Sequence, residues 1–150
     1  QMALLSHHRQ LSRLWRRAAS LHRTAAEKLL ARVGIVDQAE RACSVLAYGD
    51  LKRVELAMAL ANEPRLLLMD EPTAGMAPKE RIALMVLASE IVREQGIAVL
   101  YTEHDMDVVF GHADRVIVLN RGELIASGTG DEIRANPRVR QVYLGSRGDA

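Results

Sequence analysis

The sequence is poor in cysteine, in aromatic residues and in long apolar runs, and these shortages exclude whole classes of protein. Cys43 is the only cysteine among 150 residues, so no intrachain disulfide can form and a reducing compartment suits the chain. No apolar run reaches the roughly 18–20 residues that a membrane-spanning helix needs, and the first residues show no secretory signal pattern. We therefore expect any membrane contact to be made through a partner.

The scarcity of aromatic residues helps to interpret the uneven distribution of charge along the chain. Residues 1–60 carry ten Lys or Arg against five Asp or Glu, whereas residues 61–150 carry ten against fourteen. A basic first part could indicate nucleic-acid binding, but single-strand binding also requires aromatic side chains on which bases stack. Because no aromatics alternate with the basic residues, a solvated helical surface is the preferred interpretation, and we expect no nucleic-acid partner.

Hydrophobic periodicity and capping signals predict an α/β fold. Helical patterns mark residues 3–17, 20–33, 51–61, 78–94 and 105–110. Continuous apolar runs at 66–69 and 97–102 are typical of parallel strands that are covered on both faces. Residues 115–119 and 123–127 flank a glycine-containing loop and predict an antiparallel hairpin. Beyond the hairpin, Thr129 and Asn136 are expected to cap two short helices, the second with Val139, Val142 and Tyr143 on its buried side.

The spacing of apolar residues also predicts which helix faces are buried. For the helix that starts near Leu51, the expected stripe is Leu51, Val54, Met58 and Ala61, with Ala57 and Leu60 beside it. For the helix that starts at Pro78, the residues expected inside are Ile82, Met85, Leu87, Ile91 and Val92.

Two adjacent carboxylates, Asp70 and Glu71, follow the apolar run 66–69. Carboxylates at the end of a hydrophobic strand are costly to bury without a cation or hydrogen-bond donors, and such strand ends open into ligand crevices in α/β proteins. Asp70 is predicted to hold Mg²⁺ through water, and Glu71 to polarise the attacking water in nucleotide hydrolysis. The simpler alternative is a solvated strand end.

A second candidate segment precedes the helix that leads to this strand; its residues are Leu46, Ala47, Tyr48, Gly49 and Asp50. A turn at Gly49 would let the backbone approach a phosphate, and the helix behind it offers N–H groups and a positive dipole end. Alone, the pattern could equally be an ordinary capped helix. Gly49 lies 21 residues before Asp70, with a helix between them, and this spacing favours phosphate binding.

Histidines supply the remaining candidates. His104 comes just after the apolar run 97–102, where its imidazole can donate to an anionic phosphate oxygen; a polar surface residue is the alternative. His7, His8 and His22 lack cysteine or acidic partners at ligand spacing, so we expect no metal site there.

Residues 46–50 and 66–73 resemble the signature and Walker B motifs of an ABC transporter ATP-binding subunit. The Leu-Ala-Tyr-Gly sequence is similar to that of branched-chain amino acid importers, and residues 135–145 resemble the C-terminal segment of the same subgroup. The resemblance implies ATP and Mg²⁺ as cofactors, Glu71 as a catalytic residue and His104 as the switch histidine that bonds the γ-phosphate. It also implies that residues 46–50 act on ATP bound to a partner subunit. The positions of the family's D-loop are taken by Ala74, Gly75, Met76 and Ala77.

The sequence departs from the commonest family pattern in both loops. Ala47, Tyr48 and Asp50 replace the serine, a glycine and the glutamine of L-S-G-G-Q. A carboxylate at Asp50 weakens the attraction for a phosphate. Ala77 replaces the usual acidic or amide residue of the D-loop, so any bond from that side chain across the subunit interface is lost.

A P-loop of the form G-x-x-x-x-G-K-[ST] is absent, because none of the three lysines, Lys28, Lys52 and Lys79, follows a glycine. The resemblance therefore covers nearly the whole chain but only the second half of the family's domain. It implies a partial P-loop NTPase domain of the ABC ATPase type, a single incomplete domain overall. Residues 1–45 are expected to be part of its helical subdomain, and residues 46–150 the C-terminal part of its core, with parallel strands, a β-hairpin and a final helix.

The leading hypothesis is the C-terminal portion of the ATP-binding subunit of an ABC importer for branched-chain amino acids or similar solutes. Its expected partners are a second ATP-binding subunit, membrane permease subunits and, indirectly, a solute-binding protein. It would be cytoplasmic and peripheral on the inner face of the plasma membrane. The isolated chain is expected to hydrolyse no ATP because it lacks the P-loop.

Two other functions remain open. One is a truncated, non-catalytic regulatory or binding partner of a complete subunit. The other is an ABC ATPase of DNA repair, which is disfavoured because residues 1–45 show no sustained heptads. Since two parallel strands leave an exposed edge, we also expect an obligate partner, a dimer or a marginally stable fold.

Overall fold

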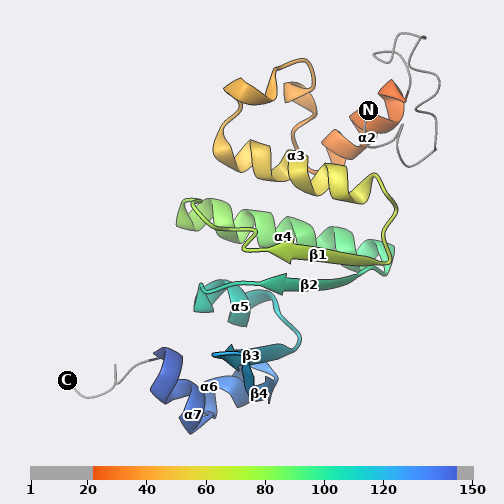
Figure 1. Ribbon diagram of the computed structural model, residues 1–150. Coiled ribbons are helices and arrows are strands. Elements are labelled where there is room, and N and C mark those ends of the chain that lie inside the picture. Colours follow the sequence, from red (N-terminus) through yellow and green to blue (C-terminus); the bar gives the residue numbers. More distant parts are fainter. Residues whose placement is uncertain (1–21, 145–150) are drawn as a thin grey trace. The chain divides into compact units, whose positions relative to one another are not determined.

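The computed structural model describes residues 22–144 as two compact units, the first ending at Thr102 and the second beginning at Glu103. The elements of the first unit are α2 (Arg23–Arg32), α3 (Tyr48–Leu60), β1 (Leu66–Asp70), α4 (Pro78–Gln95) and β2 (Ala98–Thr102) (Figure 1). Single 3₁₀ turns at Val36–Gln38 and Cys43–Val45 connect α2 to α3. The helix expected at 3–17 lies outside the described residues.

The first unit is built around a two-stranded parallel sheet. β1 and β2 run side by side in the same direction (Figure 1), with Leu66 opposite Ala98 and Asp70 opposite Thr102. The helix α4 makes the crossover between them. It starts with Pro78 in its first turn, as predicted, and ends at Gly96, whose φ of +64° suits a helix C-cap. The crossover brings the carboxyl ends of both strands to the same edge of the sheet.

Within the first unit, residues 22–102, only one face of this sheet is covered. Leu67 is 4% exposed and belongs to the core of the first unit, with Met69 and Val99 packed against that core. On the other face, Leu66, Leu68 and Leu100 are 51%, 66% and 57% exposed. The prediction that both strands are covered on both faces was therefore wrong within the first unit, because α3 and α4 contribute to a single core on one side.

The buried faces of the helices also differ from the predicted stripes. In α3, Ala57 and Leu60 are buried as predicted, and so is Ala61 just after its end. Leu56 is also buried, whereas Met58 is 55% exposed. In α4, Met85 and Ile91 are buried as predicted, but Ile82 is 55% exposed. Both helices carry apolar residues on more than one face, so the 3.6-residue period alone does not decide which face meets the sheet.

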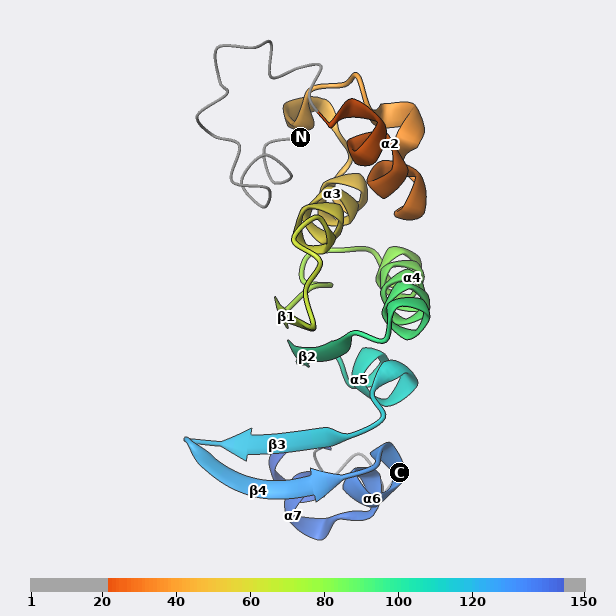
Figure 2. The same ribbon diagram turned by 90° about the vertical axis from the view of Figure 1, so that its right-hand side faces the viewer.

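The second unit is a hairpin packed against short helices. Its elements are α5 (Met106–His112), β3 (Val116–Asn120), β4 (Glu123–Gly128), α6 (Gly130–Ala135) and α7 (Pro137–Val139), followed by a turn of π-helix at Arg140–Leu144. β3 and β4 pair antiparallel (Figure 2), with an irregularity between Val118 and Leu119. The core of this unit is formed by Val109, Val116, Ile133 and Val139.

Local capping signals in the second unit are confirmed. The Asp105 carboxylate accepts from the N–H groups of residues 107 and 108, and Thr129 and Glu132 form a reciprocal capping box. Asn136 caps the turn that begins with Pro137. The expected burial of Val142 and Tyr143 was wrong: both are exposed, and the Tyr143 hydroxyl donates to the Leu119 carbonyl.

None of the helices within residues 22–144 is both long and apolar enough to cross a membrane.

Neighbouring leucines of β1 provide a matched test of the one-sided core. We expect Leu67→Ala to lower the free energy of unfolding by about 2–5 kcal/mol, because it removes a buried side chain and leaves a cavity. We expect Leu68→Ala to change it by about 0.5 kcal/mol or less, since that side chain is mostly exposed. Urea unfolding followed by circular dichroism measures both. Equal losses in the two variants would contradict the one-sided packing.

Candidate functional site

The acid pair lies at the carboxyl end of β1. Asp70 is the last residue of the strand, and Glu71 follows it with a φ of +43°, in the left-handed region that side-chain-bearing residues rarely adopt. Such a conformation costs on the order of 1–3 kcal/mol and persists only where neighbouring interactions hold it. Both side chains are exposed. The chain therefore leaves the strand through a strained residue that carries one of the two predicted functional carboxylates.

Both acids form hydrogen bonds with Thr102, the last residue of β2: Asp70 through its carboxylate and Glu71 through its backbone N–H. The Glu71 N–H donates to the Thr102 carbonyl oxygen at 3.1 Å and to the Thr102 hydroxyl oxygen at 3.1 Å. The same hydroxyl donates to Asp70 Oδ1 at 2.5 Å. The parallel register makes this possible, because Asp70 and Thr102 stand opposite each other. Sequence analysis did not single out Thr102, since the signal is a register between strands that are far apart in the chain.

A hollow of about 200 Å³ opens beside Asp70, lined by residues of α3, β1 and α4. Lys52 of α3 also lines it. The Lys52 ammonium donates to Glu55 at 3.0 Å, and this hydrogen bond raises the pKa of Lys52 above its ordinary value. The ammonium also lies 5.6 Å from the centre of the Tyr48 ring. The hollow thus combines a carboxylate at the strand end with a charged lysine from the neighbouring helix.

The segment 46–50 spans the start of α3. Leu46 and Ala47 are extended, and α3 begins at Tyr48, three residues earlier than predicted, so Gly49 and Asp50 lie in its first turn. The predicted glycine turn before the helix was therefore wrong. Gly49 is buried, and a Cβ there would lie 3.3 Å from Glu80 Oε1 and 3.7 Å from Met76 Cε. The absence of a side chain at Gly49 accordingly serves close packing against the start of α4.

Residues 74–77 pack against this segment. Gly75 has a φ of +76°, and a Cβ there would lie 3.5 Å from Cε1 of the Tyr48 ring. Met76 is buried, and its carbonyl accepts from Arg81 Nε at 2.8 Å. The Ala77 N–H donates to Glu80 Oε2 at 3.3 Å. The first unit therefore joins the loop after the acid pair to the first turn of α3.

His104 belongs to the second unit. Its side chain is exposed, and its backbone N–H donates to Glu103 Oε2 at 3.3 Å. It precedes the cap of α5 by one residue. No group of three or more potential metal-ligating side chains occurs within residues 22–144.

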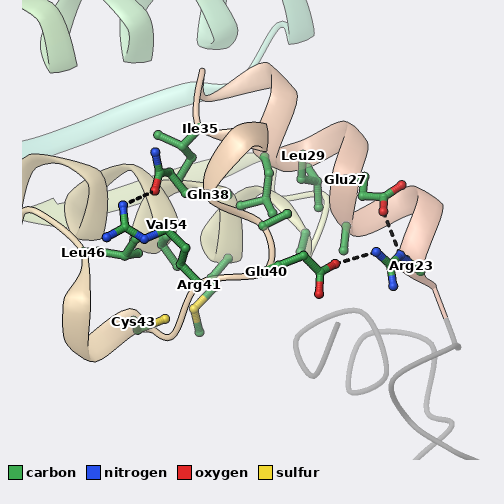
Figure 3. Close-up of a pocket in the computed structure, with 16 residues that line it drawn as sticks. Arg23, Glu27, Leu29, Ile35, Gln38, Glu40, Arg41, Cys43, Leu46 and Val54 are labelled. Atoms are coloured by element: carbon green, nitrogen blue, oxygen red, sulfur yellow. Dashed lines mark hydrogen bonds and ion pairs between the residues drawn. The ribbon is translucent and has the colours of Figure 1, made fainter.

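A larger hollow, of about 500 Å³, lies between α2 and α3 (Figure 3). Leu29, Ile35 and Val54 are among its apolar lining residues. On its rim, Arg23 donates to Glu27 at 2.8 Å and to Glu40 at 2.5 Å (Figure 3). Leu46, one of the predicted site residues, also lines this hollow.

A glycine substitution tests the junction between the two loops. Gly75→Ala forces an alanine into the left-handed region, and we expect it to lower the free energy of unfolding by about 1–2 kcal/mol. Gly75→Asn should cost less, because asparagine tolerates this conformation. As a control, Gly111→Ala, in α5 with open space around its Cβ position, should be neutral or stabilise by up to about 1 kcal/mol. Denaturant titration measures the free energy of unfolding of all three variants. An unchanged value for Gly75→Ala would contradict the positive φ of Gly75.

Two family models match the chain. Residues 2–74 match the ABC transporter model, and residues 123–149 match the model described as branched-chain amino acid ATP-binding cassette transporter. The first range includes the signature segment and the acid pair. The second includes β4 and the helices that follow it.

Curated relatives give the same family. The chain is 43% identical over 131 residues to the high-affinity branched-chain amino acid transport ATP-binding protein LivG of Salmonella typhimurium, which is 87% of this chain and 51% of LivG. It is 40% identical over 116 residues to BraF of Pseudomonas aeruginosa, covering 77% of this chain and 46% of BraF. The chain therefore spans about half the length of the curated relatives it matches.

Solved structures confirm the predicted fold class. An ATP-binding cassette of an ABC transporter in its ADP conformation matches with a TM-score of 0.73 and 30% identity, over 81% of this chain and 49% of that one. The cbiO1 protein of Clostridium perfringens, part of an ABC transporter complex, matches with a TM-score of 0.71 and 35% identity, over 83% and 50%. Because the motifs, the fold and the relatives agree, we conclude that the chain belongs to the ATP-binding subunits of ABC transporters, in the branched-chain amino acid group.

Proposed function

We propose that this chain is the C-terminal portion of the ATP-binding subunit of an ABC importer, in which ATP binding and hydrolysis drive transport of branched-chain amino acids or similar solutes. The observation that carries the proposal is the arrangement at the edge of the parallel sheet. There Asp70 and Glu71 are held by Thr102 at a strand end, beside a hollow that Asp70 lines. The names of LivG and BraF support the choice of solute class.

The acid pair fits Mg²⁺ with a nucleotide, because exposed carboxylate oxygens are the ligands that this hard cation prefers. Asp70 would hold the ion through water, and Glu71 would orient and polarise the attacking water. When bound, Mg²⁺ would neutralise part of the negative charge that develops on the phosphate oxygens. His104 would donate a hydrogen bond to the γ-phosphate.

Residues 46–50 would contact the ATP bound to a second subunit. Ala47, at the N-cap of α3, makes no side-chain cap, so the first-turn N–H groups of this 13-residue helix are not taken by that side chain. A helix start of this kind attracts anions through its N–H groups and its dipole. Asp50 in the first turn opposes that attraction. Residues 74–77 would act as the D-loop, through backbone atoms rather than the Ala77 side chain.

The P-loop must come from another segment or another chain. The exposed leucines of the sheet, Leu66, Leu68 and Leu100, are the surface on which we expect a P-loop-bearing segment to pack, because apolar strand faces gain most from being covered. The proposed partners are a second ATP-binding subunit, permease subunits and, indirectly, a solute-binding protein, at the cytoplasmic face of the plasma membrane. Residues 1–45 and 46–150 remain the proposed division between helical subdomain and core.

The second candidate is a non-catalytic partner of a complete ATP-binding subunit. The carboxylate at Asp50, which weakens attraction for a phosphate, favours it. Such a chain would co-purify with a P-loop-bearing protein and leave its turnover unchanged when Glu71 is replaced by glutamine.

Steady-state phosphate release tests the leading proposal. We expect no turnover from the chain alone, because nothing in it wraps the phosphates, and turnover when it is joined to a segment bearing G-x-x-x-x-G-K-[ST]. In the joined protein, Glu71→Gln should lower kcat by about 100-fold or more, the loss typical of removing a general base. Glu123→Gln, at an exposed hairpin position, is the matched control and should leave kcat unchanged. Ordinary turnover by the chain alone, or by the Glu71 variant, would overturn the proposal.

A further inference from the structure

Thr102 bonds both members of the acid pair, and it does so from the other strand. Its hydroxyl has one proton and two lone pairs. The proton is donated to Asp70 Oδ1 at 2.5 Å, and the oxygen accepts the Glu71 N–H at 3.1 Å. The Thr102 carbonyl accepts the same N–H at 3.1 Å. The Thr102 hydroxyl therefore holds the carboxylate of Asp70. The hydroxyl and the carbonyl of Thr102 together hold the peptide between Asp70 and Glu71.

We propose that Thr102 is a positioning residue, whose hydroxyl sets the orientation of Asp70 toward Mg²⁺ and of Glu71 toward the attacking water. This inference rests on the proposed function of the site. Thr102 itself touches neither nucleotide nor metal in this role; it acts through the two acids.

The hydroxyl is suited to orienting Asp70 without removing it from metal binding. A single proton engages one carboxylate oxygen, which fixes the plane of the carboxylate and leaves the second oxygen for a metal-bound water. Hydrogen bonds to charged groups are also stronger than neutral ones, so the Asp70 rotamer is held firmly. A carboxylate free to rotate would spend less time in the orientation that the metal-bound water requires.

The bonds to Glu71 act on its backbone. Glu71 has a positive φ, so the direction of its side chain depends on what holds the preceding peptide. The Thr102 hydroxyl and carbonyl share the Glu71 N–H, in the manner of a three-centre hydrogen bond. Removal of the hydroxyl leaves the Glu71 N–H with the carbonyl bond alone, so Glu71 should be held less firmly, and Asp70 loses the bond from Thr102 to its carboxylate.

The test compares three variants in the protein joined to a P-loop-bearing segment. Thr102→Val keeps the shape and β-branching but has no hydroxyl, Thr102→Ser keeps the hydroxyl, and Thr24→Val on the exposed surface of α2 is the control. We expect Thr102→Val to lower kcat by roughly 10- to 100-fold, the range given by loss of a hydrogen bond to a charged group. The KM for ATP should change by less than about threefold, because the P-loop rather than the acid pair supplies most of the ground-state binding of the nucleotide. Thr102→Ser should restore most of kcat, and Thr24→Val should match the parent.

A second readout follows the metal rather than the rate. Titration with Mn²⁺, detected by electron paramagnetic resonance, should show weaker binding by Thr102→Val and recovery by Thr102→Ser. A purely structural Thr102 would instead lower the unfolding midpoint with kcat and Mn²⁺ affinity intact, and that result would overturn the inference. If Thr102→Val does not fold, Thr102→Cys takes its place, because a thiol is a weak donor; parental kcat in that variant would equally overturn the inference.

The Glu71→Gln variant separates this inference from the proposed function. If Glu71→Gln abolishes turnover while Thr102→Val retains it, only the role of Thr102 fails. If Glu71→Gln retains turnover, the proposed function fails first, and the role of Thr102 falls with it.

Discussion

The hydrogen bond between Thr102 and Asp70, at the carboxyl ends of the two parallel strands, is the interaction on which the candidate site depends. It requires that β2 return beside β1 in one particular register, because a shift of one residue would turn the Thr102 side chain to the opposite face. That register is fixed by packing: Leu67, Met69 and Val99 meet a shared core with residues of α3 and α4. The positions of the two acids therefore follow from apolar contacts that lie several residues away from them.

Close packing also connects the acid pair to the first turn of α3. The loop that follows Glu71 presents Gly75 to the Tyr48 ring and Met76 to Gly49. Both glycines stand where a side chain would meet a neighbour, and Gly75 additionally has a positive φ. The two segments are those proposed above as the D-loop and the signature.

The uncovered face of the sheet is the feature that most separates this chain from a self-sufficient fold. Leu66, Leu68 and Leu100 expose apolar surface that a third strand or a further helix layer would normally bury. The chain spans about half of LivG and about half of its structural neighbours, in agreement with a domain whose other part covers this face. One-sided packing of this kind favours a further segment over the exposed leucines.

The sequence by itself determined the motifs and those features that depend on neighbours within about four residues. The caps at Asp105, Thr129 and Asn136 were predictable because their hydrogen bonds are local. Tertiary structure alone decided that Met58 and Ile82 face outward and that Thr102 joins the acid pair. Each of these depends on which elements pack together and in what register, and that choice is made by contacts between segments some thirty residues apart, such as Asp70 and Thr102. Residue spacing along the chain carries no record of such contacts.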